Sequence, residues 1–359
     1  MLDVSKAPGA YTEAEIQSTP RCWKENLRAL EGNGEVERVV GKFSSQRKWL
    51  FVGCGSSYYL ALAAAASWTA LTGLAARAIP ASELLLFPNL TLNGSSAWQP
   101  VLISRSGHTS EILQAAGRFN SEGVATIAFT CSQGQPLEDL CAATVYLPAA
   151  DEQSTVMTRS FTSMLLGLQF LAAKLAGNTA FLDSLGRLSS FVQTSLNSIS
   201  SRVQAFVESR DFADYVCLGQ GPYYGLACEG ALKVQEMSCS YSQAFHTLEF
   251  RHGPKAITGP ETLIVFLLSA SGLEAEREVL EEVKSLGGTT LVVANEVDER
   301  TRRNSDLLIH LDLAGDEYSR LAAYIIPGQL LGLYTGLKKG LDPDRPRHLS
   351  RAVILPEGS

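Results

Sequence analysis

Short apolar runs rich in β-branched and aromatic residues alternate along the chain with longer stretches of helical periodicity. In the first half the runs lie at 49–52, 78–79, 101–103, 125–129 and 144–147. In the second half they lie at 215–218, 263–268, 290–293 and 308–311, with a weaker run at 244–247. Strands that alternate with helices form parallel sheets covered by helices on both faces. The sequence therefore predicts an α/β fold of two tandem doubly wound domains, each a five-stranded, mainly parallel sheet.

The turn after the first strand of each half carries a similar pattern. Residues 51–59 read FVGCGSSYY and resemble residues 215–224, which read YVCLGQGPYY. Each copy predicts a strand, a glycine-containing turn and a helix. Tyr58 and Tyr224 stand where a dinucleotide-binding fingerprint has its third glycine, which disfavours a nicotinamide or flavin cofactor.

Segment boundaries follow from these copies and from the helical stretches around them. A helix is expected from Thr155 to Gly177 and a helical connector from Leu182 to Glu208, and Pro20 interrupts or restarts a helix near the N-terminus. The chain divides into an N-terminal helical arm at 1–35, a first domain with its connector at 36–195, a second domain at 196–340 and a C-terminal tail at 341–359 that closes on the site.

Charge and composition exclude several classes of protein. Thirty Lys and Arg against 37 Asp and Glu give a net charge of −7, which provides no broad cationic surface for nucleic acid. The most apolar segment, 60–76, is broken by Ser67 and Thr69 and predicts a buried helix, not a membrane span. Seven scattered cysteines fit reduced core thiols, and no signal peptide is recognisable, so we expect a cytoplasmic protein. Five histidines without metal-ligand spacing disfavour a metal site, and we expect no cofactor.

Two loops are candidate phosphate sites because they follow strands and begin helices. They are residues 53–57, GCGSS, and residues 104–110, SRSGHTS. In a doubly wound sheet, ligands bind beyond the carboxyl ends of the strands. Hydroxyls and free backbone N–H groups at a helix N-terminus suit an anion, although Ser and Thr at such positions are also ordinary helix caps. The residues by themselves leave both interpretations open.

A second cluster of functional side chains lies in the second half. Glu229, Lys233 and Glu236 fall at i, i+4 and i+7 of a predicted helix and share one face. A solvated salt-bridge ladder is one interpretation, but the apolar neighbours indicate a largely buried helix, where carboxylates are unusual without a role. His252 precedes Gly253 and Pro254 in a loop, where a histidine is an acid–base candidate.

The chain contains seven segments whose sequences and order along the chain resemble the tandem sugar isomerase (SIS) domain family. That family includes the isomerase half of glucosamine-fructose-6-phosphate aminotransferases and the amino-sugar-phosphate deaminase/isomerases. The segments lie at 12–21, 53–58, 104–109, 155–162, 229–236, 250–255 and 346–351. The resemblance covers nearly the whole chain.

The resemblance implies a role for each matching residue. The implied phosphate-binding residues are Ser56, Ser57, Ser104, Arg105, Ser106 and Thr109, with Arg105 where the aminotransferases carry Gln. Glu236 is the implied base that moves a proton between C1 and C2 of an open-chain sugar, and Lys233 would stabilise the developing oxyanion. His252 would open the sugar ring and reach the site from a neighbouring subunit, which implies at least a homodimer. Further implied substrate contacts are Thr155, Met157 and Arg351.

These expectations predict a phosphosugar isomerase/deaminase without cofactor. It would convert a hexosamine 6-phosphate, such as glucosamine 6-phosphate, to a ketose 6-phosphate and ammonia. The chain starts at Met1-Leu2 without the N-terminal Cys nucleophile of a glutaminase domain, so we do not expect glutamine-dependent amination. Arg351 stands where the family carries Lys and, because it stays protonated, forms no Schiff base. The alternatives are an aldose/ketose phosphate isomerase, a fructosamine-6-phosphate deglycase and a non-catalytic sugar-phosphate-binding regulator, and the pair Glu236 and His252 favours an enzyme.

Overall fold

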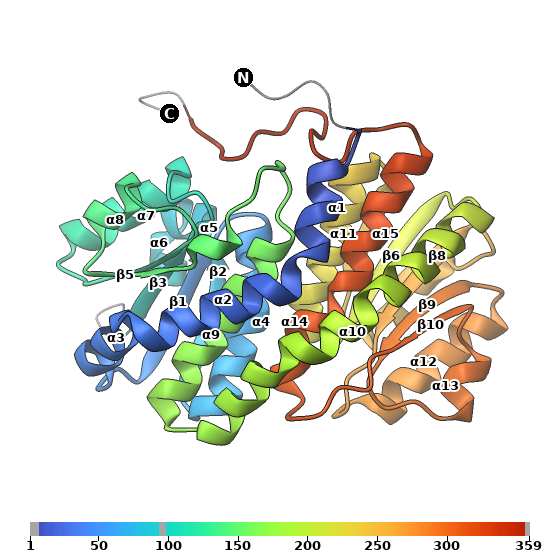
Figure 1. Ribbon diagram of the computed structural model, residues 1–359, viewed down its shortest axis with the longest axis horizontal. Coiled ribbons are helices and arrows are strands. Elements are labelled where there is room, and N and C mark those ends of the chain that lie inside the picture. Colours follow the sequence, from blue (N-terminus) through green and yellow to red (C-terminus); the bar gives the residue numbers. More distant parts are fainter. Residues whose placement is uncertain (1–6, 93–97, 356–359) are drawn as a thin grey trace. The chain divides into compact units, whose positions relative to one another are not determined.

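The chain folds into two compact units, each built around one five-stranded sheet, in a computed structural model that describes residues 7–92 and 98–355 (Figure 1). One unit combines residues 21–152, 159–189 and 350–359, and the other combines residues 1–20, 153–158 and 190–349. The sheet orders are β2-β1-β3-β4-β5 and β10-β9-β8-β6-β7, which is the same order read in opposite directions. Every strand pair is parallel. The predicted α/β fold with two five-stranded sheets is confirmed.

The strands lie close to the predicted apolar runs. The first sheet contains β1 (Lys48–Gly53), β2 (Ala75–Pro80), β3 (Gln99–Ile103), β4 (Ile127–Thr130) and β5 (Ala143–Tyr146). The second contains β6 (Asp214–Gly219), β7 (Tyr241–Phe245), β8 (Thr262–Leu267), β9 (Thr289–Ala294) and β10 (Leu307–His310). The weak run predicted at 244–247 overlaps the last two residues of β7, an edge strand, which explains its weak apolar signal.

Helices occupy most of the stretches between strands. Those before and within the first sheet are α1 (Ala10–Gln17), α2 (Thr19–Gly32), α3 (Glu35–Phe43), α4 (Ser56–Thr72), α5 (Ala81–Leu86), α6 (Pro88–Thr91), α7 (Ser110–Ser121) and α8 (Pro136–Leu140). The later ones are α9 (Arg159–Ala176), α10 (Thr179–Ser209), α11 (Tyr223–Ser238), α12 (Leu273–Ser285), α13 (Glu299–Arg303), α14 (Leu321–Tyr324) and α15 (Ile326–Lys338). Short 3₁₀ helices are η2 (Pro148–Ala150), η3 (Glu249–Arg251), η4 (Pro254–Ile257) and η5 (Tyr318–Arg320).

Three helix boundaries refine the sequence predictions. The helix expected from Thr155 begins at Arg159, because the Glu152 carboxylate accepts the Ser160 backbone N–H in the first turn of α9. Pro20 lies in the first turn of α2, so it restarts the helical arm after α1. The apolar helix α4 ends at Thr72, before Gly73 with φ +68°. Within residues 7–92 and 98–355, no helix has the length and apolar character needed to cross a membrane.

Helices cover both faces of the first sheet. Leu50 and Val52 of β1 pack in one apolar cluster with residues of α5 and α7. The alternate residues Trp49 and Phe51 contact Trp68 of α4, with ring centroids 4.4 and 5.2 Å apart. Successive side chains of a strand point to opposite faces, so β1 is buried from both sides.

In the second unit, α11 and α15 pack at backbone contact. A Cβ atom at Gly332 would lie 2.6 Å from the Lys233 carbonyl oxygen, and one at Gly336 would lie 2.2 Å from the Met237 carbonyl oxygen. Only glycine permits that approach. The close packing of α15 against α11 accompanies complete burial of the Lys233 side chain.

The first strand of each unit ends at a glycine that supports the following turn. A Cβ atom at Gly53 would lie 2.4 Å from the Ser57 carbonyl carbon, and one at Gly219 would lie 2.4 Å from the Tyr223 carbonyl oxygen. We expect Gly53→Ala to lower the free energy of unfolding by about 2–3 kcal/mol, because backbone atoms must move. Denaturant titration followed by circular dichroism measures this.

Gly117, within α7, provides the matched control. Nothing lies within 4 Å of a Cβ atom built there. Gly117→Ala is therefore expected to raise the free energy of unfolding by about 0.5–1 kcal/mol, since alanine favours the helix. Equal effects of the two substitutions would contradict the steric role of Gly53.

The buried carboxyl of Glu276 makes stability depend on pH. Burial raises the pKa of Glu276 from 4.5 to about 7. The nearby Glu317 also raises this pKa, whereas the two hydrogen bonds from Ser269 lower it. Between pH 4.5 and 7 the folded state retains a proton that the unfolded chain has lost, so stability falls as pH rises through this window. Between pH 4 and pH 8, we expect the free energy of unfolding of the wild type to fall by about 3 kcal/mol more than that of Glu276→Gln. Urea unfolding at both pH values tests this.

A carboxylate on the same helix separates this effect from general charge effects. Glu278 lies on α12 with a side chain 55% exposed. Glu278→Gln should follow the wild-type pH dependence within about 0.5 kcal/mol. A Glu276→Gln variant with the wild-type pH dependence would show that Glu276 does not titrate in this range.

Candidate active site

The two candidate phosphate loops lie at the carboxyl ends of neighbouring strands in the first sheet. Strand β1 pairs with β3, and the helices that follow them, α4 and α7, begin at Ser56 and Ser110. Ser56 and Ser57 are buried in the first turn of α4. Two helix N-termini at one sheet edge supply backbone N–H groups and positive helix-dipole ends, which suit an anion.

The hydroxyls of the second loop also shape its own turn. The Ser104 hydroxyl oxygen accepts the Gly107 backbone N–H at 3.1 Å and lies 3.3 Å from the Thr109 hydroxyl. The Ser106 hydroxyl oxygen accepts the His108 backbone N–H at 3.2 Å. Gly107 has φ +64°. The loop is therefore preorganised, and Ser104 and Ser106 have structural contacts whether or not a ligand binds.

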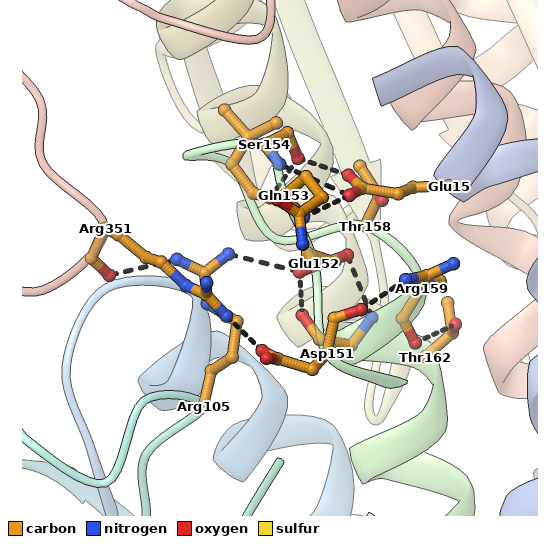
Figure 2. Close-up of polar contacts among 12 residues, drawn as sticks. Glu15, Arg105, Asp151, Glu152, Gln153, Ser154, Thr158, Arg159, Thr162 and Arg351 are labelled. Carbon is orange, nitrogen blue, oxygen red and sulfur yellow. Dashed lines mark hydrogen bonds and ion pairs between the residues drawn. The ribbon is translucent and has the colours of Figure 1, made fainter. Parts of the chain in front are cut away.

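Arg105 is buried and ion-paired within this unit. Figure 2 shows its guanidinium contacting the Glu152 carboxylate, at 3.1 Å, and the Arg351 carbonyl oxygen, at 2.9 Å. Arg351 in turn donates to the Asp151 carboxylate (Figure 2). The predicted residues Arg105 and Arg351 are thus in direct contact, and each is also ion-paired with an acidic residue that the sequence analysis did not single out. Their position shortly after β5 and η2, beyond the carboxyl end of a strand, was the available signal.

A cavity of about 540 Å³ lies beside this loop. Of the predicted residues, Ser106 and Arg351 line it, together with His108, Gln135 and Asp151. Its volume is within the range of small-ligand sites.

The segment that carries Thr155 and Met157 belongs to the other unit. The Glu15 carboxylate of α1 accepts the backbone N–H groups of Gln153 and Ser154 and the Ser154 hydroxyl (Figure 2). The Thr155 N–H donates to the Asp344 carbonyl oxygen at 3.1 Å, and Met157 is buried. Glu15 was not predicted as a functional residue, and it holds the segment in a fixed non-helical course.

Lys233 and its two carboxylates form the most strongly charged buried group of α11. Its ammonium nitrogen lies 3.2 Å from Glu229 and 2.5 Å from Glu236. Lys233 and Glu229 are fully buried, whereas the Glu236 side chain is 18% exposed. The three share one helix face as predicted, but the solvated-ladder interpretation is wrong, because α11 packs against the sheet and α15.

Electrostatics keep Lys233 charged despite burial. Desolvation lowers its pKa, but Glu229 and Glu236 more than offset this, so the pKa of Lys233 is raised. The partly exposed member of the triad is Glu236. The arrangement therefore presents a positioned carboxylate to solvent.

His252 lies in the loop between η3 and η4 of the same unit and is exposed. Residues on both sides of it are held by one carboxylate, because Glu282 of α12 accepts from Arg251 at 3.0 Å and from Lys255. The loop is thus anchored, and the imidazole faces solvent in the isolated chain. Sequence analysis did not identify Glu282.

The predicted residues fall into two groups. Ser56, Ser57, Ser104–Ser106, Thr109 and Arg351 belong to the unit of the first sheet, whereas Thr155, Met157, Lys233, Glu236 and His252 belong to the unit of the second. Within the described parts of the chain, no group of three or more His, Cys, Asp or Glu side chains has an arrangement that would hold a metal ion.

Known proteins resemble this chain over nearly its full length. An isomerizing glutamine–fructose-6-phosphate aminotransferase from Methanothermobacter thermautotrophicus is 28% identical over 342 residues, which cover 95% of this chain and 55% of that protein. The chain thus spans somewhat more than half the length of this curated relative. The crystal structure of a glucosamine-6-phosphate deaminase from Thermotoga maritima is 30% identical, with a TM-score of 0.77 and coverage of 96% of this chain and 100% of that chain.

A further solved structure supports the fold alone. Tagatose-6-phosphate ketose/aldose isomerase from Escherichia coli is 20% identical, with a TM-score of 0.84 and coverage of 98% of this chain and 100% of that chain. The family model of the SIS domain matches residues 42–174 and 190–331, which contain the two sheets. With two five-stranded parallel sheets of equal strand order and a family match to each, the chain belongs to the SIS domain family.

Proposed function

We propose that this protein is an amino-sugar-phosphate deaminase/isomerase that converts a hexosamine 6-phosphate to a ketose 6-phosphate and ammonia. The observation that carries the proposal is the buried Glu229–Lys233 pair, which positions the partly exposed carboxylate of Glu236. A fixed carboxylate at the surface of a largely buried helix is suited to proton transfer on a bound sugar. The likeness to a glucosamine-6-phosphate deaminase at 30% identity supports the substrate class.

The proposed reaction starts from the open-chain amino aldehyde. Glu236 takes the proton from C2, and the electron pair moves through C1 to the aldehyde oxygen, which gives an enolamine after that oxygen is protonated. Glu236 then returns a proton to C1, and C2 becomes an imine. Water adds to C2 and ammonia leaves, so one hexosamine 6-phosphate and one water give one ketose 6-phosphate and one ammonia. The charge of Lys233 holds Glu236 in place and offsets negative charge that develops on oxygen.

The proposed substrate phosphate contacts are the hydroxyls and backbone N–H groups of the loops after β1 and β3. The donors are Ser56, Ser57, Ser104, Ser106 and Thr109, and Arg105 adds positive charge behind the loop. Arg351 contributes a fixed cation near the cavity, ion-paired with Asp151.

His252 is proposed to open the sugar ring across a homodimer interface. An exposed imidazole on a loop anchored by Glu282 is available to a second copy of the chain. An imidazole can both accept and donate a proton, which suits ring opening, because that step needs one proton removed and another supplied.

The test is a panel of sugar phosphates with two product assays. Glucosamine 6-phosphate, its C4 epimer, glucose 6-phosphate and unphosphorylated glucosamine are incubated with the purified chain, and ammonia and ketose phosphate are measured together. We expect equal amounts of both products from a hexosamine 6-phosphate and none from glucosamine. Ketose phosphate from glucose 6-phosphate without any deamination would replace the proposal by a plain isomerase. Thermal stabilisation by a sugar phosphate without any product would replace it by a regulator.

A further inference from the structure

The second unit repeats the loop that follows β3 in the first. After β8 the chain reads Ser269-Ala270-Ser271-Gly272, which has the Ser-x-Ser-Gly pattern of residues 104–107. The hydrogen bond that closes the turn is also repeated, because the Gly272 N–H donates to the Ser269 hydroxyl oxygen at 2.9 Å, as Gly107 does to Ser104. Helix α12 begins at the next residue, Leu273.

A side chain from elsewhere in the same unit occupies this second loop. One carboxylate oxygen of Glu317 accepts the backbone N–H groups of Ala270 at 2.8 Å and Ser271 at 3.2 Å. The other accepts the Ser271 hydroxyl at 2.5 Å. Tyr223, which is buried, lies with its hydroxyl 3.4 Å from the first oxygen. Glu317 reaches the loop from the segment between β10 and η5.

These donors form the kind of arrangement that holds a phosphate or another oxyanion. Two backbone N–H groups and a hydroxyl converge on one carboxylate beside the N-terminus of α12, a thirteen-residue helix. A cavity of about 330 Å³ adjoins the carboxylate and is lined by Gln220, Gly221, Ser269 and Tyr318 among others. The loop therefore has both an anion in place and open volume beside it.

The charges around the second loop differ from those around the first. Ala270 stands at the position of Arg105 in the shared pattern. Among the described residues that line the cavity there is no lysine or arginine, and Glu276 lies beneath the loop, accepting the Ser269 N–H at 2.7 Å and its hydroxyl at 2.8 Å. An additional oxyanion would face the Glu317 carboxylate and, behind it, the carboxyl group of Glu276, with no lysine or arginine among the described lining residues to offset its charge.

We propose that residues 269–272 form a second oxyanion-binding loop that is occupied by the protein's own Glu317 carboxylate and is thereby closed to phosphate. A tethered carboxylate competes at a high effective concentration, so free phosphate does not displace it. The oxyanion class that enters once Glu317 is removed is inorganic phosphate or a phosphate monoester.

The test follows backbone amides of the full chain by NMR during titration with inorganic phosphate. In Glu317→Ala, the amide signals of Ala270 and Ser271 should shift until they saturate as phosphate is added. The dissociation constant for phosphate should be at least about tenfold lower in this variant than in the wild type. Adding Ser271→Ala should weaken that response, since one donor is lost. The control is Asp183→Ala, which removes one exposed charge on α10 and should behave as wild type.

Each other outcome counts against the proposal. If phosphate does not shift the Ala270 and Ser271 amide signals in a folded Glu317→Ala chain, Glu317 only stabilises the loop. If phosphate already shifts these signals in the wild type, the loop is open with Glu317 present. If Glu317→Ala does not fold, Glu317→Ser provides a second side chain too short to reach the loop, and the same shifts are required of it. The amides of Ser106 and Gly107 report the first loop in the same titration, so failure of the proposed function is seen separately.

Discussion

Glu236→Gln is expected to lower kcat by about 10³-fold with KM within about twofold of wild type, because it removes the proton-transferring carboxylate and leaves the phosphate loop unchanged. Lys233 keeps its ion pair with Glu229 in this variant, and the substituted side chain is partly exposed, so folding should be preserved. Ammonia and ketose phosphate release from the hexosamine 6-phosphate that the panel identifies measures the effect.

Glu208→Gln is the matched control for charge. Glu208 is exposed near the end of α10, where its carboxylate accepts a hydrogen bond from Gln204. Its substitution should leave both kcat and KM at wild-type values. Turnover by Glu236→Gln at the wild-type rate would remove Glu236 from the mechanism, and a rise in KM alone would assign it to binding.

Lys233→Met is expected to lower the free energy of unfolding by about 3–5 kcal/mol, since it leaves the Glu229 carboxylate buried without its ammonium partner. Methionine fills a similar volume, so the loss reflects charge and not a cavity. Burial is complete for both members of the pair, and α15 closes over the Lys233 backbone at Gly332. Urea titration at neutral pH measures the change.

A double variant separates the charge effect from disrupted packing. Lys233→Met with Glu229→Gln removes both buried charges and should recover at least half of the lost stability. Lys255→Met provides the exposed comparison: its ion pair with Glu282 is partly solvated, so the expected loss is at most about 1 kcal/mol. A double variant no more stable than Lys233→Met would point to packing as the cause.

Much of the fold follows from local sequence patterns. The apolar runs predicted strands in both sheets within a few residues, because buried parallel strands are continuous apolar segments. The prediction of a helix from Thr155 was wrong at its start, since residues 153–158 are held by Glu15 and Asp344, which are distant in sequence. No local pattern around Thr155 contains those partners.

Local sequence patterns predicted part of the candidate site, and long-range contacts decided the rest. The i, i+4, i+7 spacing placed Glu229, Lys233 and Glu236 on one helix face, because helical periodicity is local. Spacing did not decide between a solvated ladder and a buried triad, since that depends on the glycines of α15 that let its backbone reach α11. Partners such as Glu152 for Arg105 and Glu282 for the His252 loop were likewise beyond reach of the sequence pattern.

The sequence by itself determined the α/β class, the two-sheet repeat and the residue types at each turn, since these depend on periodicity and on the motifs of the SIS family. The tertiary structure decided which of the two similar Ser-x-Ser-Gly loops is filled. Ser104–Gly107 and Ser269–Gly272 share a pattern, but only the fold brings Glu317, from beyond β10, onto the second. Long-range packing sets the charge at each loop, and charge determines whether an anion can enter.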